Sequence, residues 1–353
     1  MKKRTRKNPV FTRFRAGLSG KVFVCVFVFL FVPVFASLSG CTPKEAETET
    51  FYASDAPEAL LKELTDAYRE TGKVLLDRGT AFFNETGSEW ALIGLRASGA
   101  LNENVRKAYL NGASETAASK DSDRMHASKS TDNARMILGI TAAGGDPSKT
   151  GGKDLLRGIS SLAYVKAQGN NGPIWALIAL DAGRYEAADA AEEADRVTRE
   201  ALVSYILSVQ RPDGGYSMMN GESDVDLTAM AVQALAPYMD DPEVRAAVER
   251  ALTHLGERQE ADGGFEGYNA RTSESISQVI IALRYAGVDP LTDGRFIKNG
   301  RTLFDALLSF RTEDGFLHEK KDGTPNGMAT DQAFLALASL FLPGGRIYAF
   351  SAG

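Results

Sequence analysis

A short apolar motif recurs six times along this chain, and this repeat constrains the fold more than any other feature. In each copy small apolar residues flank a Leu or an Ile, within a segment whose apolar residues recur every three or four positions, the period of a helix. Aligning the copies superimposes Leu95, Ile140, Leu180, Leu235, Leu283 and Leu337 at spacings of 45, 40, 55, 48 and 54 residues. The sequence therefore predicts six repeats of a helical pair.

Twelve helices follow from this period and from the Gly, Pro, Asn and Asp clusters that separate the segments. They are expected at residues 57–76, 88–98, 102–118, 131–143, 153–167, 173–182, 194–210, 225–238, 242–259, 274–286, 298–310 and 328–341. The second helix of each pair is small and apolar, as a helix buried on all sides must be, whereas the first carries charge on one face. We expect an all-α fold of inner and outer helices, closed into a ring because neither end offers an obvious polar capping repeat.

The loops that lead into the inner helices carry a second motif, Q-x-x-D-G-G-aromatic. We expect the Gln to bond free backbone groups, the Asp-Gly-Gly to make a turn with positive φ, and the aromatic ring to pack beneath the turn. The two full copies lie 49 residues apart and contain Gln210, Gly214 and Tyr216, and Gln259, Gly263 and Phe265. A weaker copy is Asp314-Gly315-Phe316, and Gln168 with Gly172 is a candidate fourth.

These loops resemble the prenyltransferase and squalene-oxidocyclase repeat, the QW motif of the α/α-toroid superfamily. The resemblance covers about 195–342 well and 85–190 faintly, and it implies an α/α toroid, a six-by-six helical barrel. Residues 224–238 and 296–332 look like bacterial cell-surface members described as transcobalamin-like. In such relatives a β-rich domain often follows the toroid, and in animal transcobalamins the two domains bind a corrinoid between them. Here the chain stops eleven residues after Leu342.

The superfamily resemblance implies two chemistries that the residues can test. Protein prenyltransferases hold zinc with Asp, Cys and His, but after Cys41 the chain has only three scattered histidines and no further Cys, so no metal site is predicted. Class II terpene cyclases protonate an alkene with the middle Asp of D-x-D-D-T-A. Residues 224–229 read D-V-D-L-T-A, so Asp226 matches the proton donor and Asp224 also matches, while Leu227 replaces the last Asp.

The acids near the starts of the inner helices have two interpretations, and the sequence leaves both open. An acid just before an apolar helix caps its free N–H groups and meets the positive end of the helix dipole. Alternatively, these groups converge at one mouth of the ring and orient a polar ligand. The acids in question are Asp224, Asp226, Glu274 and Asp331.

Two tryptophans share one position of the repeat. If this position faces the central cavity, it supplies indoles, a guanidinium and amides for a flat amphipathic ligand. Packing between the two rings of helices is the interpretation that the sequence favours for the tryptophans. The residues at this position are Trp90, Arg135, Trp175, Met230, Gln278 and Gln332.

The first forty residues have the order of a secretory signal, with a basic start and then an apolar run at 22–35. That run is shorter than the roughly 20 residues of a membrane-spanning helix. Residues 38–41, L-S-G-C, resemble the lipobox of bacterial lipoproteins, which implies that Cys41 is acylated and becomes the new N-terminus. We expect a signal at 1–40, the acylated Cys and a flexible tether at 41–55, the toroid at 56–342 and a tail at 343–353.

The formal net charge of −6 conceals a more acidic mature chain. Residues 1–40 contain eight of the 40 Lys and Arg residues and none of the 46 acids, so the remainder has 32 basic and 46 acidic residues, a net charge of −14. Nucleic-acid binding needs a basic surface, and we therefore expect no nucleic-acid partner.

The sequence predicts a lipid-anchored protein on the extracytoplasmic face of a bacterial cell envelope, which binds a ligand or a partner protein and is not an enzyme. The ligand is expected to be amphipathic, a corrinoid being one candidate, and no cofactor is assigned. One alternative is a terpene-cyclase-like enzyme with Asp226 as its general acid. A second alternative is a surface scaffold.

Overall fold

The computed structural model describes residues 57–350, except 187, 191, 268 and 269, and these residues all belong to one structural unit. The expected signal, Cys41 and the tether lie outside the described residues. Among the helices of the described part, none is long and apolar enough to cross a membrane.

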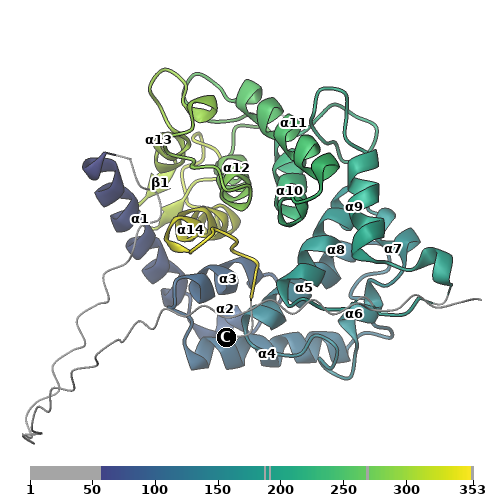
Figure 1. Cartoon of the computed structure of the whole chain (residues 1–353). Helices are drawn as coiled ribbons and strands as arrows, with labels where there is room; N and C mark the ends of the chain where they lie inside the picture. The colour runs from purple at the N-terminus through teal and green to yellow at the C-terminus, as the bar shows by residue number, and fades with distance from the viewer. Residues whose placement is uncertain (1–56, 187, 191, 268–269, 351–353) are drawn as a thin grey trace, which may run out of the picture. The chain divides into compact units, whose positions relative to one another are not determined.

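The inner helices surround a common centre (Figure 1). Each packs against the next in the chain, and the last one, α14, packs against the first, α3, so that the ring closes as predicted. The inner helices are α3 (Glu89–Ala97), α5 (Ser130–Ala142), α8 (Asn171–Ala182), α10 (Val225–Leu235), α12 (Ser273–Tyr285) and α14 (Gly327–Phe341).

The outer helices lie around this ring and precede the inner helices in the chain (Figure 1). They are α1 (Glu58–Asp77), α4 (Glu103–Ala118), α7 (Leu162–Lys166), α9 (Arg199–Ser208), α11 (Pro242–Arg258) and α13 (Leu303–Leu308). Short elements complete the described fold: α2 (Gly79–Phe83), α6 (Leu155–Gly158), the 3-10 helices η1 (Glu193–Asp195), η2 (Ala236–Tyr238) and η3 (Gly294–Phe296), and the antiparallel pair β1 (Arg311–Thr312) and β2 (Gly315–Phe316).

Three predicted outer helices differ from the observed ones. The helix predicted at 194–210 begins only at Arg199, because Thr198 is its N-cap and accepts from Ala201 N. The segment 153–167 is divided into α6 and α7, and the side chain of Ser161 caps the second of these by accepting from Tyr164 N. The helix predicted at 298–310 begins only at Leu303, because Asn299 and Gly300 have φ of 52° and 76°. The sequence also missed the short strands β1 and β2.

Close contact between inner helices depends on small residues. A Cβ atom at Gly94 in α3 would lie 2.5 Å from a ring carbon of Phe334 in α14. Phe334 is fully buried, and Tyr68 of α1 stacks on it with ring centroids 5.5 Å apart. The two ends of the helical domain therefore meet through a large side chain that fits against a glycine.

The Q-x-x-D-G-G-aromatic loops have the predicted geometry. Nε2 of Gln210 donates to the carbonyl of Gly214 at 2.9 Å and to that of Ala247 in α11 at 2.8 Å. Nε2 of Gln259 likewise donates to Gly263 and to Phe296 in η3, both at 3.0 Å. Each Gln thus ties its own turn to the next outer segment.

The other two parts of the motif also follow the prediction. Gly214 and Gly263 have φ of 85° and 86°, and the rings of Tyr216 and Phe265 are buried beneath the turns. The candidate fourth copy is different, because Oε1 of Gln168 accepts from the backbone N–H of Thr131 in α5 and not from its own turn.

The segment after α14 packs inside the ring. Ile347 and Tyr348 are buried, the backbone N–H of Tyr348 donates to the hydroxyl of Tyr285 at 3.0 Å, and that of Phe350 donates to the carbonyl of Ala182 at 2.8 Å. The residues set apart as a tail are therefore part of the helical domain as far as Phe350.

Candidate functional site

The repeat position shared by the two tryptophans faces the ring axis. The rings of Trp90 and Trp175 lie 5.1 Å apart, and both pack against Tyr348, at 6.0 and 5.7 Å. Packing between the inner and outer rings, which the sequence favoured for the tryptophans, is therefore wrong. Gln278 and Gln332 share this repeat position, and Nε2 of Gln278 donates to Oε1 of Gln332 at 2.9 Å.

The two acids at the start of α10 have different roles. Asp224 is the N-cap, and its Oδ1 accepts from the backbone N–H of Leu227 at 2.9 Å. Asp226 lies one turn before Met230 on the axial face, and its Oδ1 is buried without a hydrogen-bond partner among the described residues. The capping interpretation is confirmed for Asp224, whereas Asp226 makes no cap.

The surroundings of Asp226 favour its protonated form. Burial raises the pKa of Asp226 to about 6, and the carboxylates of Asp224 and Glu274 add to this rise. The hydroxyl of Ser275 acts in the opposite direction. A carboxyl group with this pKa exists partly as the acid near neutral pH, as a general acid requires.

Glu274 lies at the corresponding position of the next repeat and has a cationic partner. Nδ1 of His318, in the loop after β2, lies 2.9 Å from Oε1 of Glu274, and this contact raises the pKa of His318. The N-cap of α12 is Thr272, whose hydroxyl accepts from Ser275 N, so Glu274 is not a cap either. The structure thus places Asp226, Glu274 and His318 at one mouth of the ring.

Asp331 and Glu89 form a second pair of acids at this mouth, and each has an arginine partner. Nη1 of Arg78 lies 2.5 Å from Oδ1 of Asp331, and Nε of Arg135 lies 3.3 Å from Oε2 of Glu89. Burial raises the pKa of Asp331 to about 6 despite Arg78, and it also raises the pKa of Glu89 despite Arg135. Sequence reasoning missed Glu89, although it precedes Trp90 just as Asp331 precedes Gln332.

The mouth at the N-terminal ends of the inner helices therefore holds Glu89, Asp226, Glu274 and Asp331 besides the N-cap Asp224. Among residues 57–350 as described, no three His, Cys, Asp or Glu side chains lie close enough together to hold a metal ion. Glu89, Glu274 and Asp331 each have a cationic neighbour, whereas no ion pair of Asp226 with a described residue is found. Asp226 is thus the acid at this mouth best suited to release a proton.

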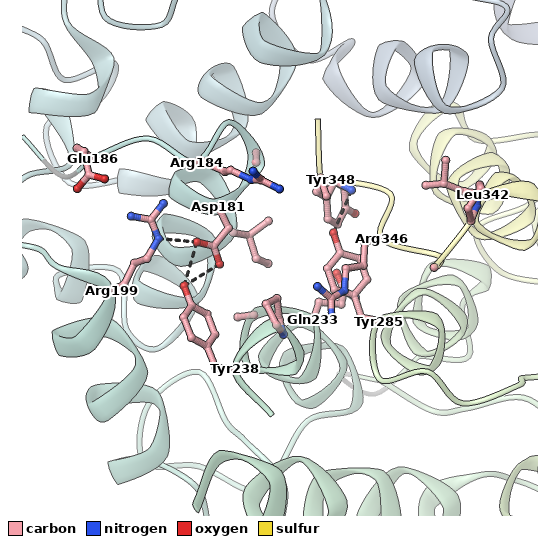
Figure 2. Close-up of a pocket in the computed structure, with 17 residues that line it drawn as sticks. Asp181, Arg184, Glu186, Arg199, Gln233, Tyr238, Tyr285, Leu342, Arg346 and Tyr348 are labelled. Atoms are coloured by element: carbon pink, nitrogen blue, oxygen red, sulfur yellow. Dashed lines mark hydrogen bonds and ion pairs between the residues drawn. The ribbon is translucent and has the colours of Figure 1, made fainter. Parts of the chain in front are cut away.

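A large pocket lies at the opposite mouth, where the inner helices end. Its volume is about 630 Å³, and it is lined by the ends of α8, α10 and α12 and by the segment after α14 (Figure 2). Asp181 is neutralised there, because Oδ1 lies 2.7 Å from Nε of Arg199 and both carboxylate oxygens accept from the hydroxyl of Tyr238 at 2.9 Å. None of the ligand-binding residues predicted from the sequence lines this pocket.

Comparison with known proteins agrees with this fold. Residues 173–281 match the family model of the prenyltransferase alpha-alpha toroid domain. Two drimenyl diphosphate synthases, from Streptantibioticus cattleyicolor and Streptomyces showdoensis, are 33% identical over 90 residues and 32% identical over 97 residues. The matched segments span only 16% and 18% of these two relatives.

Solved structures of low sequence identity share the same architecture. Protein geranylgeranyltransferase-I from Candida albicans superimposes with a TM-score of 0.54 at 14% identity, covering 77% of this chain and 90% of that one. A type II terpene cyclase from Scytonema superimposes with a TM-score of 0.50 at 10% identity, covering 80% of this chain and 98% of that one. The helical domain of this chain is therefore an α/α toroid, with a segment that matches the prenyltransferase toroid family.

Proposed function

We propose that the toroid catalyses the cyclisation of an isoprenoid, with Asp226 as the general acid. The observation that carries this proposal is the state of the Asp226 carboxyl group, whose Oδ1 is buried at the axial mouth, which makes no helix cap and which has a pKa raised to about 6. An alkene is a very weak base, and only an acid with little stabilisation of its carboxylate protonates it readily.

The proposed reaction is an isomerisation. Asp226 transfers its proton to one carbon of a terminal double bond, and the other carbon becomes a cation. The π electrons of the next double bond attack that cation and form a carbon–carbon bond that closes a ring. Loss of a proton from a carbon atom to water forms the final double bond, and solvent returns a proton to Asp226. No oxidant, reductant or metal is needed.

The axis below Asp226 suits a carbocation. Met230 follows one turn later on the same face of α10, and Trp90 and Trp175 lie on the axial faces of α3 and α8. Indole rings attract positive charge at their faces, and they offer a hydrocarbon chain an apolar surface.

The relatives support this proposal more than they support a protein without chemistry. The matched curated proteins are named drimenyl diphosphate synthases, and a superimposed structure is named a type II terpene cyclase. The departure lies at Leu227, which stands in place of the last Asp of the D-x-D-D pattern. In this chain Asp224 and Ser275 are the polar groups left to adjust the acidity of Asp226.

The test is product formation by the purified full-length chain in detergent from farnesyl diphosphate, geranylgeranyl diphosphate and squalene. We expect a cyclic product by gas chromatography and mass spectrometry, and a loss of at least 100-fold in rate with Asp226→Asn. Asp241→Asn is the matched control, because Asp241 caps the outer helix α11 and Asn caps as well as Asp. No product from any of the three substrates, or an Asp226→Asn rate within threefold of the unmodified chain, would overturn the proposal.

A second candidate is ligand binding without chemistry, and the position of the large pocket favours it. Tyr348 fills the space between Trp90, Trp175 and Tyr285 at the centre of the toroid, whereas the pocket of about 630 Å³ at the opposite mouth offers space for a ligand away from Asp226. Titration with cobalamin and other tetrapyrroles, followed by absorbance and melting temperature, tests the amphipathic ligand expected from the sequence. An unchanged spectrum and melting temperature at micromolar ligand would count against a corrinoid.

We also propose, from the sequence motif alone, that Cys41 is acylated and holds the toroid at the outer face of a membrane. Such a location would bring the domain close to lipid substrates. Partition of the full chain into a detergent phase, lost with Cys41→Ala, is the expected result. Equal partition of the two proteins would contradict it.

A further inference from the structure

We infer that residues 343–350, the segment after α14, form a plug that closes the centre of the toroid and moves aside when an isoprenoid chain enters. The chain runs from the end of α14 into the middle of the ring, where Tyr348 packs against Trp90 and Trp175 (Figure 1). The kind of ligand rests on the proposed function, but the inference concerns access to the centre and needs no acid chemistry.

Tyr348 occupies the surface that an apolar chain would use. Its ring is 1% exposed, and its centroid lies 6.0, 5.7 and 6.1 Å from those of Trp90, Trp175 and Tyr285. Indole faces offer apolar surface to a hydrocarbon, but in a close-packed interior one group at a time packs against them. A hydrocarbon chain that lies on the tryptophans must therefore displace Tyr348.

Few hydrogen bonds hold the plug in the ring. Within the described part of the chain, its backbone makes two hydrogen bonds to the inner helices, from Tyr348 N to the hydroxyl of Tyr285 at 3.0 Å and from Phe350 N to the carbonyl of Ala182 at 2.8 Å. The hydroxyl of Tyr348 is buried without a partner among the described residues, and water would satisfy it once the plug moves out. Apolar packing thus holds the plug, and an apolar ligand can replace that packing.

Two glycines join the plug to α14. Leu342 ends the helix in an extended conformation, and Gly344 and Gly345 then have left-handed φ values of 70° and 66°. Glycine enters and leaves this conformation at little steric cost. On the helix side of the joint, Nε of Arg284 donates to the carbonyl of Ser339 at 3.2 Å. The plug can therefore turn about the glycines while α14 stays in the ring.

Open space lies beside the plug. The pocket of about 630 Å³ is lined by Gly344, Arg346 and Tyr348 of the plug and by the ends of α8, α10 and α12 (Figure 2). Gly344, Arg346 and Ala349 are exposed, so one side of the plug already faces solvent. Withdrawal of Tyr348 would join this pocket to the space between the tryptophans without a change in the ring of helices.

The experiment follows tryptophan fluorescence, because the two tryptophans of the chain both contact Tyr348. The full-length chain in detergent is titrated with farnesol, an uncharged isoprenoid. We expect saturable binding, at least tenfold tighter in Tyr348→Ala because the centre of this variant is already open. Tyr348→Phe is the matched control, and its affinity should stay within twofold of the unmodified chain.

The joint is tested with Gly344→Ala. A Cβ atom at Gly344 meets no atom within 4 Å, so this change acts through the left-handed backbone and disfavours the closed plug. We expect farnesol to bind at least threefold more tightly. Gly300→Ala is the matched control, because Gly300 has a φ of 76° and equally open surroundings but lies in the turn before α13. This control should bind farnesol as the unmodified chain does.

Hydrogen exchange measures whether the plug moves. Saturating farnesol should speed the exchange of the amide protons of Tyr348 and Phe350 at least tenfold and leave those of α8 unchanged. Because these assays need no turnover, a failure to form cyclic products would not affect them, and a chain that cyclises with a fixed plug would refute this inference alone. The inference would be overturned by the absence of saturable binding, by a Tyr348→Ala or Gly344→Ala affinity equal to that of its control, or by unchanged exchange in the presence of bound farnesol.

Discussion

The two mouths of the toroid differ in the charged side chains that lie at the ends of the inner helices. Acids lie where these helices begin, and arginines lie where they end. Helix dipoles favour acids where the inner helices begin and bases where they end. At the first mouth, Asp224, Thr272 and Asn326 make the caps. At the second, Arg199 and Arg284 bond to the terminal carbonyls. The charged groups that do not bond to a helix end are the ones that suggest a function.

The charged groups that do not bond to a helix end also differ in burial between the two mouths, and burial determines their chemistry. Asp226 is half-buried with its Oδ1 covered, and its pKa is raised to about 6 because burial penalises the carboxylate. Arg184 and Arg346 are exposed. The first mouth therefore offers an acid, whereas the second exposes two cationic side chains at the large pocket.

The largest expected effect concerns the side chain that reaches the centre from the second mouth. Tyr348→Ala should lower the free energy of unfolding by about 3–5 kcal/mol, because it removes a buried ring packed against Trp90 and Trp175. Tyr348→Phe is the matched variant and should cost less than about 1 kcal/mol, since the hydroxyl is buried with no partner in the described part of the chain. Denaturant unfolding followed by tryptophan fluorescence measures both. Equal losses for the two variants would contradict this packing.

An intermediate effect is expected at the first mouth. The pKa of Asp226 rises from an ordinary 3.8 to about 6 on folding, so between these values the folded state binds more protons than the unfolded state. Stability is then lost as the pH rises through this window. Asp226→Asn should therefore stabilise the protein by about 1–3 kcal/mol at pH 7.5 and should have little effect near pH 4.

Urea unfolding at the two pH values measures this difference. Asp241→Asn, the cap control on α11, should not stabilise the protein at pH 7.5, because Asn caps as well as Asp. A loss of stability with Asp226→Asn at pH 7.5 would mean that the carboxylate is stabilised by partners that the described residues do not include.

The smallest effect concerns His318, whose pKa is raised chiefly by its hydrogen bond to Glu274. A base with a raised pKa adds stability below its unfolded pKa, and this stability is lost as the pH rises through the folded value. The side chain of His318 is 42% exposed, so His318→Gln should cost less than about 1 kcal/mol at pH 5.5 and nothing at pH 8.5. Thermal unfolding at both pH values tests this, and an equal cost at both would contradict a charged pair.

The sequence predicted the features that recur in the repeats, and it missed the features that occur only once in the chain. The ring, the roles of Gln210 and Gln259 and the repeat position shared by Trp90 and Trp175 all follow from the repeated motifs, although the sequence favoured packing between the two rings of helices for these tryptophans. The insertion of residues 343–350 was missed, because four buried or half-buried residues in a short irregular segment have no periodic pattern.

Two further residues were missed for different reasons. The pair of Glu274 and His318 joins residues 44 positions apart, one of them in a loop, and no local pattern indicates it. Arg184 was visible in principle, because alignment with Gly144 and Gly287 reveals an arginine where the backbone favours glycine. The departures from the repeat thus carried more functional information than the repeat itself.

The central claim is that Asp226 is a proton-donating acid and not a helix cap, and the titration of its carboxyl group tests this claim most directly. Carbon-13 NMR of the chain labelled at the aspartate carboxyl carbons, compared with Asp226→Asn to assign the signal, gives its pKa. The account predicts a value of about 6. A value below 4 would contradict it, because the carboxyl group would then be ionised and stabilised like an ordinary cap.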